Sequence, residues 1–432
     1  MRISTSMIYD LGITSMEQIR NSQVKLQEQV GASKRILTPS DDPAASAAAL
    51  IVRQSQALNS QLKNNGDNAK WQLGLEEGAL SDTTTLLQDV KTIAVYAGNP
   101  TLSNADRATL AAELSNRYQD LLGIANRGDG TGQYLFSGYQ GATQPFSETS
   151  PGNVVYSGDA GQRLAQIGTV RVIPVSDSGE SIFRTVKNGN GTVVAAQGAA
   201  NSGLGVISPA TVNDPIKWNG ATNPKDFTIK FAQDISVVPP ITSYDIIDNA
   251  TNLSLLTGAA PAAPPYLRSF VSGSNISLAT QSPPDTNATP FDFGAMVTVT
   301  GTPASGDTFS IKASTNQDIF TTLHGLITTL QTPNTLSTAT YQNSLNSAML
   351  SLDNALNNVL SVRTDVGARL KAVDTAQSTS DDLSLQYSKT LSGLEDLDYA
   401  KAISDLSVQQ LSLQAAQQSF MKISSLNLFS LL

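Results

Sequence analysis

The chain offers few of the side chains that catalysis uses. Its 432 residues include one histidine, His324, and no cysteine. A serine–histidine–aspartate triad would need His324 as its base, and a single histidine without thiolates disfavours zinc catalysis. It stands beside Phe320 and Leu323 in an amphipathic segment, which is typical of a histidine on the flank of a helix. The sequence therefore predicts a protein that is not an enzyme and that has no cofactor and no metal.

Two acidic motifs have the residue types that could bind a cation. Asp41 and Asp42 lie between two prolines, but no third ligand is near them in the sequence. We therefore predict that Asp42 caps a helix that begins at Pro43. Residues 128–132, Gly-Asp-Gly-Thr-Gly, fit neither a calcium loop nor a phosphate loop and predict a tight turn. The sequence does not exclude a pair of catalytic carboxylates for glycoside hydrolysis, although no pattern indicates one.

Composition and charge argue against two further classes of protein. The net charge of −9 and the pI near 4.7 disfavour a nucleic-acid-binding protein, which would carry a basic patch. No run of about 18 apolar residues is present, so we expect no membrane span. The first ten residues lack the continuous apolar segment of a conventional signal peptide. The absence of cysteine excludes disulfides and is compatible with export.

The element most clearly encoded is a long helix from Tyr341 to the end of the chain. Every seventh residue from Leu345 is apolar: Leu345, Leu352, Val359, Val366 and Val373. This spacing is typical of a coiled coil, whose stripe another helix must cover. No proline follows position 335, so we expect one uninterrupted helix of roughly 130 Å at 1.5 Å per residue.

Thinner stripes occur at both ends of the chain. Residues 5–37 carry one at helical spacing: Ile8, Leu11, Ser15, Ile19, Ser22, Leu26 and Gln29. The C-terminal segment carries another: Ile403, Leu406, Gln410, Leu413, Gln417 and Phe420. We expect the two to pair, and the alternative is a terminal helix docked on its own core. The assembly interface predicted from these segments is Ile8, Leu11, Ile19, Leu26, Ile403, Leu406, Leu413, Phe420, Ile423, Leu426, Leu428 and Leu431.

The middle of the chain differs in character from its ends. Helices are predicted over 43–97, from a capping box at Ser103 and Asp106, and over 317–331. Residues 134–139 read as a strand, and short alternating runs rich in glycine, proline, serine and threonine follow up to about residue 313. The predicted fold class is α+β: a long antiparallel coiled-coil or helical bundle made from both chain ends, with an inserted, mostly β domain.

These elements predict three parts of the chain. Residues 1–42 and 390–432 would form terminal axial helices, and 43–145 with 314–389 would form a helical bundle core. Residues 146–313 would form an inserted β-rich outer domain. Because the terminal seams are thin and partly polar, we expect them to be mobile in the isolated monomer and to become ordered only on assembly.

Both ends of the chain resemble the flagellin superfamily, and more closely the hook-associated protein 3 family of hook–filament junction proteins. The resemblance rests on four groups of residues: 1–9, Met-Arg-Ile-Ser-Thr-Ser-Met-Ile-Tyr; 34–44, which include Pro-Ser-Asp-Asp-Pro-Ala; 366–370, Val-Gly-Ala-Arg-Leu; and 396–400, Asp-Leu-Asp-Tyr-Ala. Residues 134–138 and the segments 301–303 and 306–309 also fit hook-associated proteins. Flagellins usually continue their Asp-Asp pair with Ala-Ala-Gly.

The resemblance implies a secreted structural protein of the bacterial flagellum, exported without a cleaved signal peptide. It implies a ring of copies of this chain between hook-associated protein 1 and flagellin, and a cytoplasmic flagellar export chaperone. No nucleic acid and no membrane is expected among the partners. The alternatives are a filament-forming flagellin, or an adhesin or enzyme that carries its activity in the inserted domain of a flagellin-like frame.

Overall fold

The computed structural model describes residues 5–332 and 338–429, without the side chains of residues 5, 6 and 424–429. The chain divides into two compact units. The first comprises Met1–Asp67, Gln166–Arg171 and Asp374–Leu432, and the second comprises Asn68–Ala165 and Val172–Val373. Helices from both chain ends and a central set of antiparallel strands give the α+β fold class that the sequence predicts.

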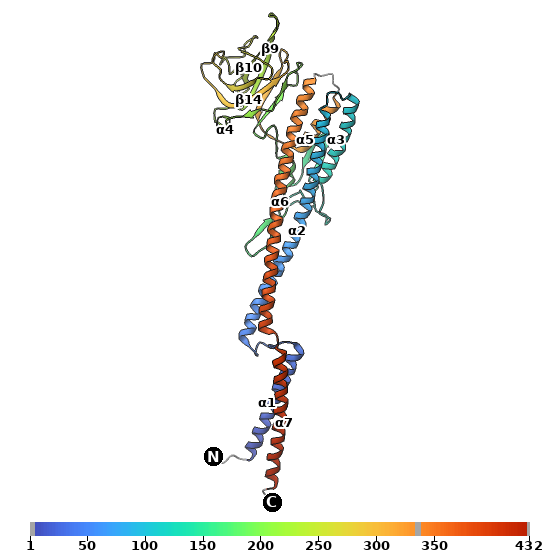
Figure 1. Cartoon of the computed structure of the whole chain (residues 1–432), viewed down its shortest axis with the longest axis vertical. Helices are drawn as coiled ribbons and strands as arrows, with labels where there is room; N and C mark the ends of the chain where they lie inside the picture. The colour runs from blue at the N-terminus through green and yellow to red at the C-terminus, as the bar shows by residue number, and fades with distance from the viewer. Residues whose placement is uncertain (1–4, 333–337, 430–432) are drawn as a thin grey trace. The chain divides into compact units, whose positions relative to one another are not determined.

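Long helices lie at both ends of the sequence (Figure 1). The helices are α1 (Thr5–Ala32), α2 (Pro43–Ala97), α3 (Asn104–Ala125), α4 (Pro215–Trp218), α5 (Ile319–Gln331), α6 (Thr338–Glu395) and α7 (Tyr399–Phe429), with a π-helical turn at Glu180–Arg184. The capping box is present as predicted, because Ser103 and Asp106 exchange hydrogen bonds at the start of α3. Asp42 caps α2 as predicted, since its Oδ1 accepts the Ala45 amide at 3.0 Å.

The apolar stripe of α6 packs against α2 within the second unit. All five residues of the predicted row, from Leu345 to Val373, are at most 1% exposed. Leu73, Leu80 and Leu87 of α2 are equally buried, and α3 packs against α5 beside them. The two long helices are antiparallel, because Arg363 pairs with Glu77 while Lys91, further along α2, pairs with Asp353 near the start of α6.

An aromatic cluster joins α5 to the segments that follow α3. Phe146, Phe183 and Phe320 have ring centroids 5.4–6.1 Å apart, and Phe136 meets Phe183 edge to face at 5.4 Å. All four phenylalanines are fully buried. Residues on both sides of position 146 thus belong to one core with α5.

Sixteen strands are assigned among the described residues. They are β1 (Phe146–Ser150), β2 (Asn153–Tyr156), β3 (Leu164–Gln166), β4 (Val172–Pro174), β5 (Val186–Lys187), β6 (Val193–Gln197), β7 (Val206–Ile207), β8 (Thr211–Val212), β9 (Asp226–Asp234), β10 (Ile241–Asp248), β11 (Leu253–Ser254), β12 (Arg268–Ser269), β13 (Asn275–Ala279), β14 (Asp292–Thr300), β15 (Thr308–Ala313) and β16 (Asn316–Gln317). The largest sheet has the order β11-β10-β9-β15-β6, with β12 also paired to β10.

The β region has its own hydrophobic core. A second sheet, β13-β14-β7 with β8 paired to β14, carries Ile276, Val297 and Val299 into the same core as Phe227, Phe231 and Phe309 of the larger sheet. A buried ion pair lies beside it: Arg268 contacts Asp285 through Nε and Nη2 at 2.9 and 2.5 Å. Arg268 also donates to the carbonyl oxygens of Ser277 and Ala279, so its donors are well satisfied.

The prediction of a strand over residues 134–139 is wrong. Tyr134 forms an isolated bridge with Gly128, and the chain then turns through Gly138, whose φ is +71°. The apolar run instead places Phe136 inside the aromatic cluster, while the Phe136 carbonyl accepts the Gly179 amide at 2.9 Å. Burial of one aromatic side chain, and not sheet pairing, explains the apolar character of this segment.

The single C-terminal helix that the sequence predicts is interrupted. α6 ends at Glu395 and α7 begins at Tyr399, although no proline lies between them. Asp396 instead forms a β-bridge with Lys34, and the Leu397 amide donates to the Ser33 carbonyl at 3.3 Å. Asp398 then caps the new helix, since its Oδ1 accepts the Lys401 amide at 3.1 Å. Bonds to a distant segment therefore replace the helical bonds here.

Candidate assembly region

The first unit pairs the two ends of the chain, as the thin stripes predict. α1 and α7 lie side by side (Figure 1). They run antiparallel, because Tyr9 meets Phe420 at one end while Ser33 hydrogen-bonds the Tyr399 hydroxyl at the other. This pair contains most of the residues predicted for assembly, so we take it as the candidate functional region.

The seam between α1 and α7 follows a heptad spacing that differs from the predicted one. Its covered residues on α1 are Tyr9, Gly12, Met16, Ile19, Gln23, Leu26 and Val30, and the predicted member Gln29 is partly covered as well. Those on α7 are Ala402, Leu406, Gln409, Leu413, Ala416 and Phe420. The predicted seam members Ser15, Ser22, Gln410 and Gln417 are exposed, so that part of the prediction is wrong.

Small residues determine which faces meet. A Cβ atom on Gly12 would lie 2.9 Å from Cδ2 of Phe420, so the glycine makes room for that ring. Ala402 on α7 is only 2% exposed. Close approach of the two backbones covers these small residues, and it leaves larger apolar side chains outside the seam. Sequence reasoning missed Gly12, Ala402 and Ala416. The available signal was their spacing: Gly12 lies four residues before Met16, Ala402 four before Leu406, and Ala416 three after Leu413.

The predicted interface residues fall into two groups. Ile19, Leu26, Leu406, Leu413 and Phe420 lie in the seam within the chain. Ile8, Leu11, Ile403 and Ile423 are exposed on the outside of the same two helices. The side chains of Leu426 and Leu428, and Leu431 as a whole, lie outside the described residues.

The pair therefore presents apolar side chains to the outside as well as to its own seam. Leu11 is 60% exposed and Leu411 is 67% exposed. The other exposed large apolar residues of the two helices are Met7, Ile8, Ile13, Val24, Tyr399, Ile403, Val408, Met421 and Ile423. We therefore take these exposed apolar side chains as the outer face of the candidate region.

A joint of two loops holds the base of the helix pair. The Arg35 amide donates to the Glu395 carbonyl at 2.7 Å, and the Arg35 guanidinium donates to the Leu394 carbonyl at 2.8 Å. Glu395 also accepts ion pairs from Lys34 at 3.3 Å and from Arg53 at 2.5 Å. Two of the motifs that carry the resemblance, 34–44 and 396–400, thus meet in this joint.

Asp41 and Asp42 in the joint are held in their charged form by hydrogen-bond donors of the protein. The pKa of Asp41 is held well below its usual range by a hydrogen bond from Lys25 and by the Thr38 and Leu37 amides. The pKa of Asp42 is lowered by the Ala45 amide and by Arg35. Both carboxylates are therefore used to fix the loop and to begin α2.

The remaining sequence candidates for chemistry lie apart from this region. His324 is partly covered on the flank of α5, with its ring against Gly152. Asp129 accepts hydrogen bonds from Thr131 and Gln133 in a turn, as predicted. Among the described residues, no group of three or more His, Asp or Glu side chains could hold a metal ion. Within the same residues, no helix is both long and apolar enough to cross a membrane.

Comparison with known proteins gives the class first. Residues 3–141 match the family model of the bacterial flagellin N-terminal helical region. A flagellin of Clostridium tyrobutyricum is 28% identical, but over only 32% of this chain and 37% of its own length. The helical arms thus have the architecture of flagellin-like proteins of the bacterial flagellum.

More complete matches give the family. Flagellar hook-associated protein 3 of Salmonella typhimurium is 27% identical over 100% of this chain and 99% of its own length. The crystal structure of hook-associated protein 3 from Legionella pneumophila is 30% identical, with a TM-score of 0.67 over 80% of this chain and 98% of that one. The chain belongs to the flagellar hook-associated protein 3 family.

Family membership settles the general function. The chain is a structural, flagellin-like protein of the bacterial flagellum and, in this family, a hook–filament junction protein. The prediction of a junction protein is confirmed over the alternative of a filament-forming flagellin.

Proposed function

We propose that this chain forms a ring of identical subunits in the flagellar axis, between hook-associated protein 1 and flagellin. The role is structural and not catalytic. The observation that supports this proposal is the helix pair α1/α7, whose seam is closed within the chain while residues such as Leu11 and Leu411 stay exposed. Neighbouring subunits would bury that outer face, at about 25 cal/mol for each Å² of apolar surface removed from water.

The same observation supports coupling of order to assembly. The seam includes Gly12, Gln23 and Gln409, so it buries little apolar area for each residue. Ordering the backbone costs about 1–2 kcal/mol per residue, and the outer contacts with neighbours would offset that cost. An export chaperone in the cytoplasm would hold the C-terminal region before secretion, which would proceed without a cleaved signal peptide.

The substitution Leu411→Asp tests the outer face. We expect the variant monomer to keep its melting temperature, because Leu411 is 67% exposed, and to be secreted but missing from the hook tip. Quantitative immuno-electron microscopy of isolated flagella would measure incorporation, and hydrogen exchange of the monomer would measure order in α1 and α7. We expect the backbone amides of α1 and α7 to exchange fast in the free monomer.

Gln414→Asp is the matched control, because Gln414 is also exposed on α7 but polar. This variant should reach the hook tip in normal amounts. Normal incorporation of Leu411→Asp would rule out the outer face as the assembly surface. Strong protection of α7 in the free monomer would instead contradict the coupling of order to assembly.

A further inference from the structure

A pocket of about 390 Å³ lies in the second unit, between strand β6 and helices α5 and α6. Its volume falls within the range of about 300–1,000 Å³ that is usual for ligand pockets. Among the residues that the structure describes, the lining contains no charged and no aromatic side chain. Alanine, glycine, serine, threonine, asparagine and glutamine supply most of it, so the pocket is polar but neutral.

The floor of the pocket is the free edge of a sheet. β6 is the last strand of the largest sheet and pairs only with β15 among the described strands. All five residues of β6 line the pocket in sequence. Because successive side chains of a strand point to opposite faces, an unbroken run of lining residues means that the backbone edge itself faces the pocket.

The register shows which backbone groups point off the sheet. The Gly198 amide donates to the Thr308 carbonyl, and the Ser314 amide donates to the Thr192 carbonyl. Since hydrogen-bonded pairs alternate along an antiparallel ladder, Val194 and Ala196 bond to β15, whereas Ala195 and Gln197 direct their N–H and C=O groups away from it. Such unpaired edge groups are a template for another strand.

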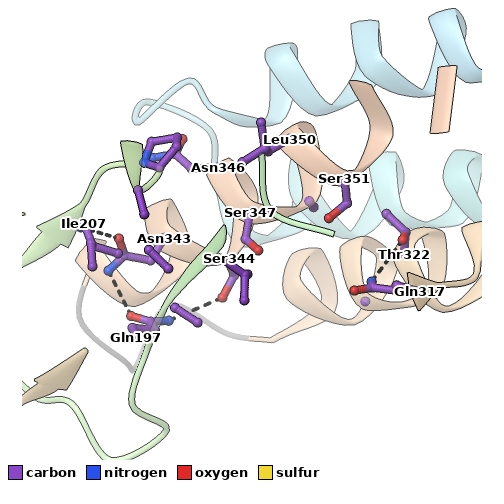
Figure 2. Close-up of a pocket in the computed structure, with 18 of the residues that line it drawn as sticks. Gln197, Ile207, Gln317, Thr322, Asn343, Ser344, Asn346, Ser347, Leu350 and Ser351 are labelled. Carbon is purple, nitrogen blue, oxygen red and sulfur yellow. Dashed lines mark hydrogen bonds between the residues drawn. The ribbon is translucent and has the colours of Figure 1, made fainter. Parts of the chain in front are cut away.

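The opposite wall is a row of hydroxyl and amide side chains. Figure 2 shows Asn343 and Ser344 of α6 near Gln197 at one end of the pocket, and Ser351 near Gln317 and Thr322 at the other. Asn343 donates to Gln197 Oε1 at 3.0 Å and accepts the Ile207 amide at 2.8 Å. These bonds fix the end of β6 against α6, so the space between them is preformed.

We propose that this edge binds an extended, uncharged peptide segment of a partner protein as an added strand beside β6. Backbone groups of the peptide would pair with Ala195 and Gln197, and small polar side chains would face the hydroxyls of α6. The neutral lining disfavours a charged ligand, and the absence of an aromatic residue from the lining leaves no surface on which a sugar ring could stack. This proposal does not depend on the proposed contacts between α1 and α7 of neighbouring subunits.

A blocked heptapeptide of alternating threonine and valine is a suitable probe, used with the full-length protein. We expect a saturable change in fluorescence anisotropy of the labelled peptide, and slowed hydrogen exchange at the Ala195 and Gln197 amides. The same peptide N-methylated at alternate residues should bind at least tenfold more weakly, because it lacks the amide donors that pair with the edge.

Two variants assign the binding to this site. Ala195→Pro removes an outward-pointing N–H at a position where an edge strand tolerates proline, and Ser347→Lys places a charge in the neutral wall. Each should weaken binding at least tenfold, while Asn357→Lys, elsewhere on the exposed part of α6, should not. Equal binding of the N-methylated peptide, or binding unchanged in both pocket variants, would overturn the proposal. So would Ala195 and Gln197 amides that are already protected in the free protein.

Discussion

Glu76 of α2 is a buried carboxyl group that lies beside a second acid and one arginine. Its side chain is 2% exposed, and its Oε1 accepts the Asp177 amide at 3.0 Å. Arg369 makes a two-pronged ion pair with Asp177, at 2.8 and 3.1 Å. Burial, and then the charge of Asp177, raises the pKa of Glu76 to about 8. One guanidinium thus stabilises one carboxylate, and Glu76 is protonated at neutral pH.

The raised pKa predicts a fall in stability with rising pH. The unfolded chain loses the Glu76 proton near pH 4.5, whereas the folded chain keeps it to about pH 8. Between these values the folded state binds more protons, so the free energy of unfolding decreases as pH rises, by at most about 1.4 kcal/mol per pH unit, and levels off above pH 8. Glu76→Gln, which keeps the acceptor oxygen, should flatten this dependence in melting curves from pH 5 to 9.

The control for that experiment is Glu113→Gln, at an exposed position of α3. Its melting temperature should follow the wild-type profile across the same range. A Glu76→Gln variant that keeps the wild-type slope would show that Glu76 does not carry the effect.

At the scale of the elements, the seam between α2 and α6 holds the second unit together. Its five central residues on α6 are all at most 1% exposed, and successive members lie seven positions apart. Neighbouring positions on the same helix are much more accessible, as Leu360 shows with an exposure of 38%. A heptad seam concentrates apolar contact on one face of each helix, so its stability depends on position more than on residue type.

Val359→Asp and Leu360→Asp test this dependence on position. Val359 is 0% exposed, so an unpaired carboxylate there should lower the free energy of unfolding by roughly 3–5 kcal/mol. At Leu360 the same side chain can remain in water, and a change of less than about 1 kcal/mol is expected. Urea unfolding followed by circular dichroism at 222 nm would measure both. Similar losses at the two positions would mean that the seam does not determine the stability of the helices.

At the scale of the whole molecule, the β region leaves and rejoins the helical part at two adjacent strands. β5 pairs with β16, where Lys187 lies opposite Asn316, and the Asn188 amide donates to the Thr315 carbonyl at 3.0 Å. Residues 146–186 contribute Phe146 and Phe183 to the core that contains Phe320 of α5. The predicted boundaries of the insert, 146 and 313, remain a prediction. Because Phe146 and Phe183 lie in the core with α5, we choose Asn188 as the last residue kept before the part of the β region to be excised.

Excision at this base should leave the helical part folded. Replacing residues 189–314 with an Asn-Gly turn joins strands that are already paired, so it closes a hairpin without moving the aromatic cluster. We expect helical circular dichroism and the near-ultraviolet signal of the aromatic cluster around Phe320 to persist. A deletion of similar length that begins earlier in the chain, 170–290, would remove Phe183 and should destabilise the helices. Unfolding of the variant that lacks residues 189–314 would show that the β region supports the helical part.

The sequence by itself determined those features whose signal is local or strictly periodic. All five positions of the predicted heptad row of α6 are buried, because this row lies on the apolar face of the helix. The capping box of α3 and the cap at Asp42 followed from side chains that bond amides three residues away. Two of the four groups of residues that carried the resemblance, 34–44 and 396–400, meet in one joint.

Only the tertiary structure decided which face of each terminal helix is inside. α1 and α7 carry apolar residues on more than one face, so hydrophobicity alone does not select a seam. The choice depends on Gly12 and Ala402, which let the backbones approach and leave the larger Leu11 and Leu411 outside. The interruption after Glu395 was also decided at long range, because residues 33–35 compete for the backbone groups there. A stripe or a helix break of this kind is a property of two segments, and neither segment specifies it alone.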